Sequence, residues 1–189
     1  MFDESFPKEL NKDLQEVLRI IPKKTFNNVR NGCTEKVIEY RCNHDMIKIP
    51  YRMYFIDAAI SKIRNLTDVQ KVMLYCIYTR SCDGYIREKY LNELLKIHFD
   101  DWVIPFIVKL CDEYVVEILE VIYNQLKYRN NNDIKTFCLE NKSMLNKSYS
   151  RMISYWNEYY RNREFDLHKY VGWKLFEECL GYDKSFEKK

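Results

Sequence analysis

A helix-turn-helix pattern in the middle of the chain constrains the fold more than any other feature. Residues 68–81 are apolar almost all round, and the polar turn 82–84 separates them from a second helical pattern. Thr67 and Gln70 have the spacing of a capping box, in which each residue satisfies a free amide of the other. Asp83-Gly84 is typical of a tight turn. The pattern therefore predicts two helices packed as a hairpin.

The rest of the chain repeats this theme. Only 4 Gly and 4 Pro occur in 189 residues, and this scarcity of turn formers disfavours a fold of many short strands. Apolar residues at helical spacing predict further helices. They cover approximately 10–21, 54–64, 101–110, 112–126, 133–142, 147–163 and 166–180. Residues 34–42 fit either a short strand pair or another helix, and we favour the helix.

These segments predict an all-α fold of stacked helical hairpins with an irregular N-terminal region. Helix pairs begin near Asp68, Asp101 and Asp133, at intervals of 33 and 32 residues. That interval is close to the period of helical repeats, so a short α-solenoid-like array is one form of this fold. We expect a single helical domain over 1–189, with a less regular region at 1–66 and a helical core at 67–181.

Two arginines of the central hairpin are expected to point toward apolar surface. At 100° per residue, Arg80 and Arg87 both fall on the apolar faces of their helices. A buried guanidinium stays charged, so it needs a carboxylate, a group of carbonyl oxygens or a bound anion. We favour an internal ion network with Asp83, Glu88 or Glu113. The alternative is an anion pocket around Arg80, Asp83 and Arg87 in an enzyme or ligand sensor.

A second candidate site is an acidic segment. Between residues 98 and 126 the chain holds six acidic residues and one lysine, although its net charge is +3. The acidic residues are Asp100, Asp101, Asp112, Glu113, Glu117 and Glu120. Such a segment can steer a basic protein partner and speed its association. We expect Glu113, Glu117 and Glu120 to lie together in solvent and to take part in recognition if the protein has a basic partner. The alternative, a solvated helix face without a partner, is the commoner explanation of such a segment.

The third candidate is an aromatic and basic segment near the C-terminus. Aromatic and arginine side chains alternate there, as they do on surfaces that bind single-stranded nucleic acid. The segment comprises Tyr149, Arg151, Tyr155, Trp156, Tyr159, Tyr160, Arg161 and Arg163. Since Tyr149, Ile153, Trp156 and Tyr160 follow helical spacing, a buried stripe explains the same residues. We favour the buried stripe, because too little positive charge is present to hold a polyanion.

Cysteine usage and hydropathy indicate the compartment. The first ten residues are polar and acidic, unlike a secretory leader, so the seven cysteines are expected to be reduced thiols in a cytoplasmic protein. No apolar stretch reaches the roughly 20 residues that span a bilayer, which predicts a soluble protein without membrane contact.

Known catalytic and metal-binding motifs do not occur in the sequence. Cys33, Cys42 and His44 could supply zinc ligands, but their spacing fits no compact finger and no fourth ligand is evident. Cys82, at a helix start beside Arg80 and Asp83, is the best candidate for a reactive thiol, because a helix N-terminus and a cation both lower the pKa of a thiol. We favour the alternative, a cysteine of the core or the turn. We therefore expect no metal, no cofactor and no catalytic residue.

Four short stretches carry a resemblance. They are 75–80, 83–88, 102–106 and 113–119. Together these residues resemble a family of small helical bacterial proteins of no settled function. The resemblance implies a helical, cytoplasmic protein of the accessory or immunity type and transfers no catalytic residue.

The functional expectation is a non-enzymatic protein-binding module. It would engage a basic partner through the acidic segment, in an immunity-type or regulatory role. Nucleic-acid binding is the less favoured use of the chain, and the oligomeric state stays open.

Overall fold

The computed structural model describes residues 2–22, 32–43, 45–97, 100–183 and 186. These residues are mostly helical, with a small two-stranded sheet. The chain forms two compact units, one of residues 1–40 and 45–106 and the other of residues 41–44 and 107–189. We expected a single helical domain whose regular core begins at residue 67, whereas the main boundary between the two units falls between residues 106 and 107.

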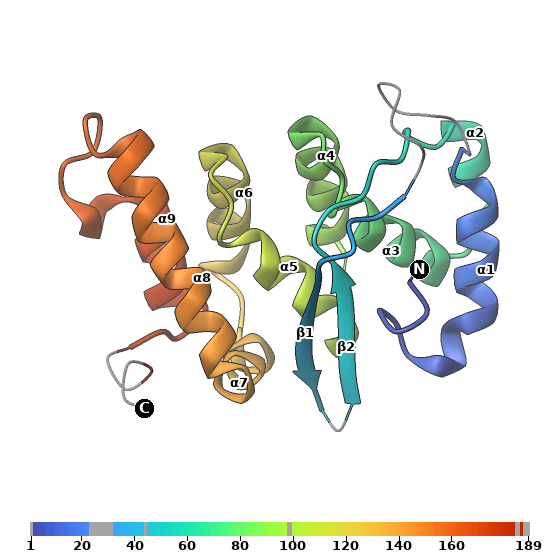
Figure 1. Ribbon diagram of the computed structural model, residues 1–189, viewed down its shortest axis with the longest axis horizontal. Coiled ribbons are helices and arrows are strands. Elements are labelled where there is room, and N and C mark those ends of the chain that lie inside the picture. The colour runs from blue at the N-terminus through green and yellow to red at the C-terminus, as the bar shows by residue number, and fades with distance from the viewer. Residues whose placement is uncertain (1, 23–31, 44, 98–99, 184–185, 187–189) are drawn as a thin grey trace. The chain divides into compact units, whose positions relative to one another are not determined.

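The first unit is built around helix α3 (Asp68–Tyr78). This helix packs against α1 (Asn11–Ile20) and against α4 (Gly84–Leu95), as Figure 1 shows. The predicted helix-turn-helix is therefore present, and α3 ends three residues earlier than expected. It ends early because residues 79–81 make a tight turn into α4.

Side-chain caps fix the starts of both hairpin helices. The Gln70 amide donates to Thr67 Oγ1 over 3.3 Å, and the Thr67 amide donates to Gln70 Oε1 over 3.1 Å. The predicted capping box is thus confirmed. Gln70 Nε2 also donates to Asp13 Oδ1 over 2.8 Å, which ties α3 to α1. At the next helix, Asp83 accepts hydrogen bonds from amides in the first turn of α4.

The helix predicted over residues 34–42 is wrong. Strand β1 (Val37–Cys42) pairs with strand β2 (Asp45–Pro50) in a hairpin. Side chains of β1 alternate between exposed and buried, so the pattern has the period of two that strands require. Asn43 in the turn has φ of +56°, a left-handed conformation that Asn tolerates better than most residues.

Residues at the N-terminus cover one edge of this hairpin. The Lys48 amide of β2 donates to the Glu4 carbonyl over 2.8 Å, and Ser5 Oγ donates to the Lys48 carbonyl over 2.5 Å. Lys48 Nζ also lies 3.0 Å from Glu4 Oε1. The main-chain groups of Lys48 on that edge are therefore satisfied within the unit.

The helix predicted over residues 54–64 is shorter than expected. Only α2 (Ile60–Ile63) is helical. The Met53 amide donates to the Arg80 carbonyl, and the Cys82 amide donates to the Met53 carbonyl, both over 2.8 Å. Because this pairing with the turn after α3 holds the preceding chain extended, the helix starts late.

The second unit contains the remaining helices. After a 3-10 turn at Asp101–Val103, helix α5 (Ile104–Leu110) crosses from the first unit into the second. The second unit then holds α6 (Val116–Leu126), α7 (Asn132–Glu140), α8 (Lys142–Tyr155) and α9 (Val171–Lys174). Within this unit, α6 packs against α9, and α8 packs against both α7 and α9.

Several helix boundaries in the second unit differ from the sequence predictions. Helix α6 starts four residues later than predicted. Helix α8 starts earlier and continues as a π-helical turn, Trp156–Tyr160. Asp133 lies in the first turn of α7 and does not cap it, whereas Asp166 caps only a 3-10 turn, Leu167–Lys169. Helix α9 continues as a π-helical turn, Leu175–Cys179, and Gly181, with φ of +70°, ends this last helical segment as expected.

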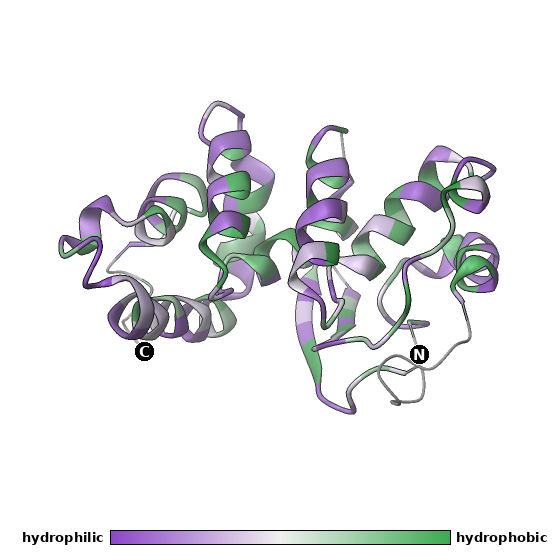
Figure 2. Cartoon of the chain, turned by 90° about the horizontal axis from the view of Figure 1, so that it is seen from above, coloured by the Kyte–Doolittle hydropathy of each residue, from purple (hydrophilic) through white to green (hydrophobic). Residues whose placement is uncertain are grey.

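The best amphipathic pattern of the sequence forms the core of the second unit. Figure 2 shows hydrophobic residues along one side of α6 and hydrophilic residues along the other. Ile118, Leu119 and Ile122 are fully buried, as predicted. Val115, which was also expected to be buried, lies before the helix and is half-buried.

Among the described residues, no helix has the length and apolar character to cross a membrane.

Candidate functional site

The two hairpin arginines are buried in the first unit. Arg80 has no exposed surface and Arg87 is 2% exposed. Arg80 Nη2 donates to the Tyr51 carbonyl over 2.9 Å, and its Nε lies 3.4 Å from the Pro50 carbonyl. Arg87 Nη1 donates to the Ser81 carbonyl over 2.9 Å. Main-chain oxygens therefore contribute to solvating both guanidinium groups.

Asp83 does not take the role predicted for it in an ion network. Its Oδ1 accepts from the Tyr85 amide over 2.9 Å and from the Ile86 amide over 3.4 Å, and it bonds to neither arginine. A short side chain at the N-cap reaches its own helix start more easily than a buried group. Since Arg80 is closed to solvent, an external anion reaches its guanidinium only if the unit opens.

The predicted acidic segment is partly buried. Asp100 and Asp101 are exposed and belong to the first unit, whereas Glu117 and Glu120 are exposed on α6 of the second unit. Asp112 and Glu113 are 2% and 3% exposed. The prediction that Glu113 lies in solvent beside Glu117 and Glu120 is therefore wrong, because α6 starts only at Val116 and Glu113 precedes it in a buried connection.

Asp112 is the centre of a buried ion cluster. Its two carboxylate oxygens accept hydrogen bonds from Lys109 Nζ and from Arg151 Nη1. The side chains of Asp112 and Lys109 are 1% and 3% exposed. Paired burial of this kind explains why one of the predicted acidic residues is inside the protein.

The aromatic segment of the second unit is more exposed than the favoured interpretation predicted. None of Tyr149, Ile153, Trp156 and Tyr160 is fully buried. The buried apolar residues of α8 are Leu145 and Met152 instead. The expected buried stripe is therefore wrong for these four residues. The π-helical turn from Trp156 also changes the angular spacing that the prediction assumed.

Four tyrosines form a cluster that we call the aromatic surface: Tyr114, Tyr155, Tyr159 and Tyr160. The ring centroid of Tyr114 lies 6.1 Å from that of Tyr155 and 6.2 Å from that of Tyr159. Tyr159 also contacts Tyr155 and Tyr160. Tyr114 and Tyr159 remain 51% and 57% exposed. Sequence spacing could not reveal this cluster, because Tyr114 is far from the other three in the chain.

Tyr160 anchors the aromatic surface to the start of α6. Its hydroxyl donates to the Tyr114 carbonyl over 2.6 Å and accepts from the Val116 amide over 3.3 Å. Burial is the main cause that raises the Tyr160 pKa, so the hydroxyl stays protonated for both bonds. The ring of Tyr160 stacks on buried Tyr170, with centroids 5.6 Å apart. The cluster is therefore held in one arrangement by the unit beneath it.

Close packing supports this anchor from below. A side chain at Gly172 would place its Cβ 2.5 Å from Tyr170 Cε1 and 2.9 Å from Met152 Cγ. Glycine thus allows α9 to approach α8 closely just after Tyr170, the ring on which Tyr160 stacks.

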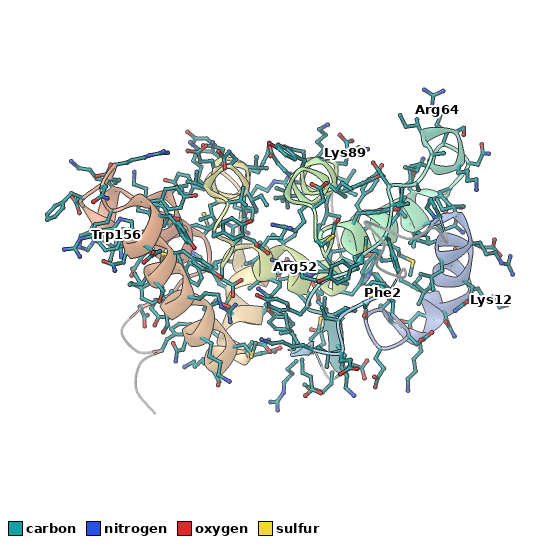
Figure 3. All side chains as sticks on the ribbon, turned by 45° about the horizontal axis from the view of Figure 1, so that its top comes forward. Phe2, Lys12, Arg52, Arg64, Lys89 and Trp156 are labelled. Carbon is teal, nitrogen blue, oxygen red and sulfur yellow. The ribbon has the colours of Figure 1, made fainter. Side chains whose placement is uncertain are left out.

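The basic residues of the same segment are partly engaged with neighbouring rings. Arg161 lies over the rings of Trp156 and Phe165, at 5.7 Å and 5.5 Å from their centroids. Its Nη1 donates to Asn157 Oδ1 over 2.9 Å, and Trp156 Nε1 donates to the Glu164 carbonyl over 2.9 Å. Figure 3 shows where Trp156 lies in this segment.

Two predictions concern cysteine chemistry: a reactive thiol at Cys82 and a zinc site at Cys33, Cys42 and His44. Burial, followed by the adjacent Asp83 carboxylate, raises the pKa of the Cys82 thiol, so the expected lowering is wrong. His44 lies outside the described residues, which leaves the site with Cys33 and Cys42 untested. Among the residues that the structure does describe, no three His, Cys, Asp or Glu side chains gather as metal ligands.

Comparison of the chain with known proteins does not assign it to a family. No protein family, curated protein or solved structure matches the chain. The resemblance to small helical bacterial proteins therefore stays a prediction.

Proposed function

We propose that the chain is a non-enzymatic protein-binding module that engages a basic partner through its second unit. The contact surface would comprise the aromatic surface together with Glu117 and Glu120 of α6. The observation that carries this proposal is the exposure of Tyr114 and Tyr159, whose rings touch each other while the Tyr160 anchor holds them. An exposed, ordered group of tyrosines is typical of the residues that dominate binding energy in protein interfaces.

The charge beside these rings favours a basic partner. Glu117 and Glu120 lie one helical turn apart in α6, and both are exposed. Like charges at this spacing repel each other modestly, and a cation relieves that cost. A lysine or arginine of the partner could lie over a tyrosine ring and pair with a glutamate at once. This binding would serve an immunity-type role, which the resemblance implies, or a regulatory role.

The same carboxylates disfavour nucleic-acid binding at this surface. The Tyr160 hydroxyl accepts from the Val116 amide, the residue next to Glu117, so this carboxylate lies at the edge of the cluster, where its charge repels a phosphate. We further propose that the helical hairpins stack as a short α-solenoid-like array. Such an array would present the binding helices on a continuous face.

The test uses two double variants of the full-length protein. A photocrosslinking residue at position 159 identifies the partner in native cells, and the purified partner is then titrated. Tyr114→Ser with Tyr159→Ser, and separately Glu117→Lys with Glu120→Lys, should each weaken binding by about tenfold or more. The glutamate variant should also flatten the salt dependence of association.

The matched control removes two other exposed tyrosines. Tyr85 and Tyr128 are 86% and 85% exposed, and neither belongs to the aromatic surface. Replacing both with Ser should change affinity by less than about twofold. Equal affinities for the wild type and the two surface variants would rule the proposal out. So would capture of single-stranded RNA that the glutamate reversal strengthens.

A further inference from the structure

A cavity in the first unit has the lining of a small-molecule site. Its volume is about 360 Å³, which is within the range of pockets that hold drug-sized ligands. Three helices contribute the lining residues. These are Ile60, Ile63 and Arg64 at α2, Lys71 and Tyr75 on α3, and Lys89, Tyr90 and Glu93 on α4.

One wall of the cavity is aromatic and firmly held. The ring centroids of Tyr75 and Tyr90 are 5.6 Å apart, and Tyr78 stacks behind Tyr90 at 4.6 Å. The Tyr90 hydroxyl donates to Asp57, and the Tyr78 hydroxyl donates to the Ile56 carbonyl over 2.7 Å. These bonds fix the rings of Tyr78 and Tyr90, and the Tyr75 ring packs against Tyr90, so the wall can receive a flat or aliphatic group with little rearrangement.

The opposite wall is apolar and unused by the core. Helix α2 buries none of its residues, and Ile60 is 64% exposed. A helix of a single turn that packs nothing into the core contributes little stability of its own. A ligand between Ile60, Ile63 and the Tyr75 ring would remove this apolar surface from water.

The charges at the rim favour an anion. Three cations line the cavity against one carboxylate, Glu93, which is itself bonded to Lys96 at 2.6 Å. Lys71 and Lys89 each pair with an aspartate outside the lining. Among the described residues no carboxylate lies within ion-pair distance of Arg64, whose side chain Figure 3 shows extending outward from α2. An incoming anion would therefore find two ammonium groups that are shared with aspartates and, once the Arg64 side chain turns toward the rim, one uncommitted guanidinium.

The Tyr75 hydroxyl supplies a further donor. It has no hydrogen-bond partner among the described residues, and burial is the main cause that raises its pKa, followed by the charge of Glu93. The hydroxyl therefore keeps its proton at neutral pH. We propose that this cavity binds a small organic anion with an apolar, ring-sized body and one carboxylate or phosphate head.

The test uses 2-naphthoate as the probe and its neutral amide, 2-naphthamide, as the matched ligand. Titration of the full-length protein, followed by calorimetry and by amide chemical shifts, should show saturable naphthoate binding with shifts in α2, α3 and α4. Naphthamide should bind about tenfold more weakly, the equivalent of one interaction of about 1.4 kcal/mol. Inorganic phosphate should bind more weakly than naphthoate, because it lacks the apolar body.

Matched variants separate the cavity from general charge effects. Arg64→Gln should weaken naphthoate binding about tenfold, whereas Lys62→Gln, on the same turn but outside the lining, should change it less than about twofold. Ile60→Ser should weaken it and Val69→Ser should not. Three results would overturn the proposal: equal affinity for the amide and the acid, equal effects of Arg64→Gln and Lys62→Gln, or no saturation by about 5 mM naphthoate.

Discussion

The two units keep buried positive charge in different ways. In the first unit, the guanidinium groups of Arg80 and Arg87 donate to main-chain carbonyls of neighbouring segments. In the second unit, buried Lys109 and half-buried Arg151 both donate to the buried side chain of Asp112. Main-chain carbonyl oxygens remain when the side chain of their residue is replaced, whereas the carboxylate is lost when Asp112 is replaced. The second arrangement should therefore be far more sensitive to a single substitution.

The helix starts show the same contrast. In the first unit, Thr67 and Asp83 cap α3 and α4 from positions next to each helix. In the second unit, α6 has no side-chain cap from its own N-cap residue, and its first amide is satisfied by Tyr160, which is 44 residues away. Local caps can be recognised in a sequence, but a cap from a distant tyrosine cannot.

The largest expected effect is on the ion cluster of the second unit. Asp112→Asn keeps the shape of the side chain but removes the charge that Lys109 and Arg151 contact, and should cost about 3 to 5 kcal/mol of unfolding free energy. Urea unfolding measures this loss. The matched change of an exposed carboxylate in the same unit, Glu120→Gln, should stay within about 0.5 kcal/mol. Similar values for both variants would remove the contrast between the units.

A smaller loss is expected at the buried arginine of the first unit. Arg80→Met fills similar space but loses the bonds to the Pro50 and Tyr51 carbonyls, which should cost about 2 to 3 kcal/mol. Exposed Arg19→Met is the control and should stay within about 0.5 kcal/mol.

Thermal melts with added phosphate test the alternative use of Arg80 as an anion site. Phosphate should shift the melting temperature of the wild type and of Arg80→Met equally, because the guanidinium is closed to solvent. A gain in the wild type alone would instead indicate ligand binding at Arg80.

The distant cap of α6 should be worth less than either charge. Tyr160→Phe removes the hydroxyl that bonds the Val116 amide and the Tyr114 carbonyl, with an expected cost of about 1 to 1.5 kcal/mol. Hydrogen exchange at the Val116 amide should speed up in this variant. Tyr85→Phe, which removes a hydroxyl from an exposed ring, should leave both the stability and that exchange rate unchanged.

The smallest expected effect concerns the local cap of the first unit. Thr67→Ala should cost about 1 kcal/mol, whereas Thr67→Asn should retain most of the stability, because asparagine also accepts the bond from the Gln70 amide. Chemical unfolding of the two variants measures the difference. If Thr67→Asn lost as much as Thr67→Ala, the cap would contribute little and the contrast in helix starts would fail.

The accuracy of the sequence predictions follows this contrast between local and distant interactions. The central hairpin, its capping box and the buried face of α6 were predicted because the residues that form each element are neighbours in the chain. The β-hairpin was missed although its signal was present, since Ile38, Tyr40 and Cys42 alternate with exposed residues. The aromatic surface was missed because Tyr114 joins it from a separate segment.

The sequence by itself determined that the chain is mostly helical, where its strongest hairpin lies and that Arg80 and Arg87 face apolar surroundings. Helical spacing and caps act over a few residues, so one sequence contains enough information to predict them. Tertiary structure alone decided which groups satisfy those arginines, which acidic residues are buried and which tyrosines meet in solvent. Each of these depends on contacts between segments that are far apart in the chain, and a local sequence pattern does not show which segments meet.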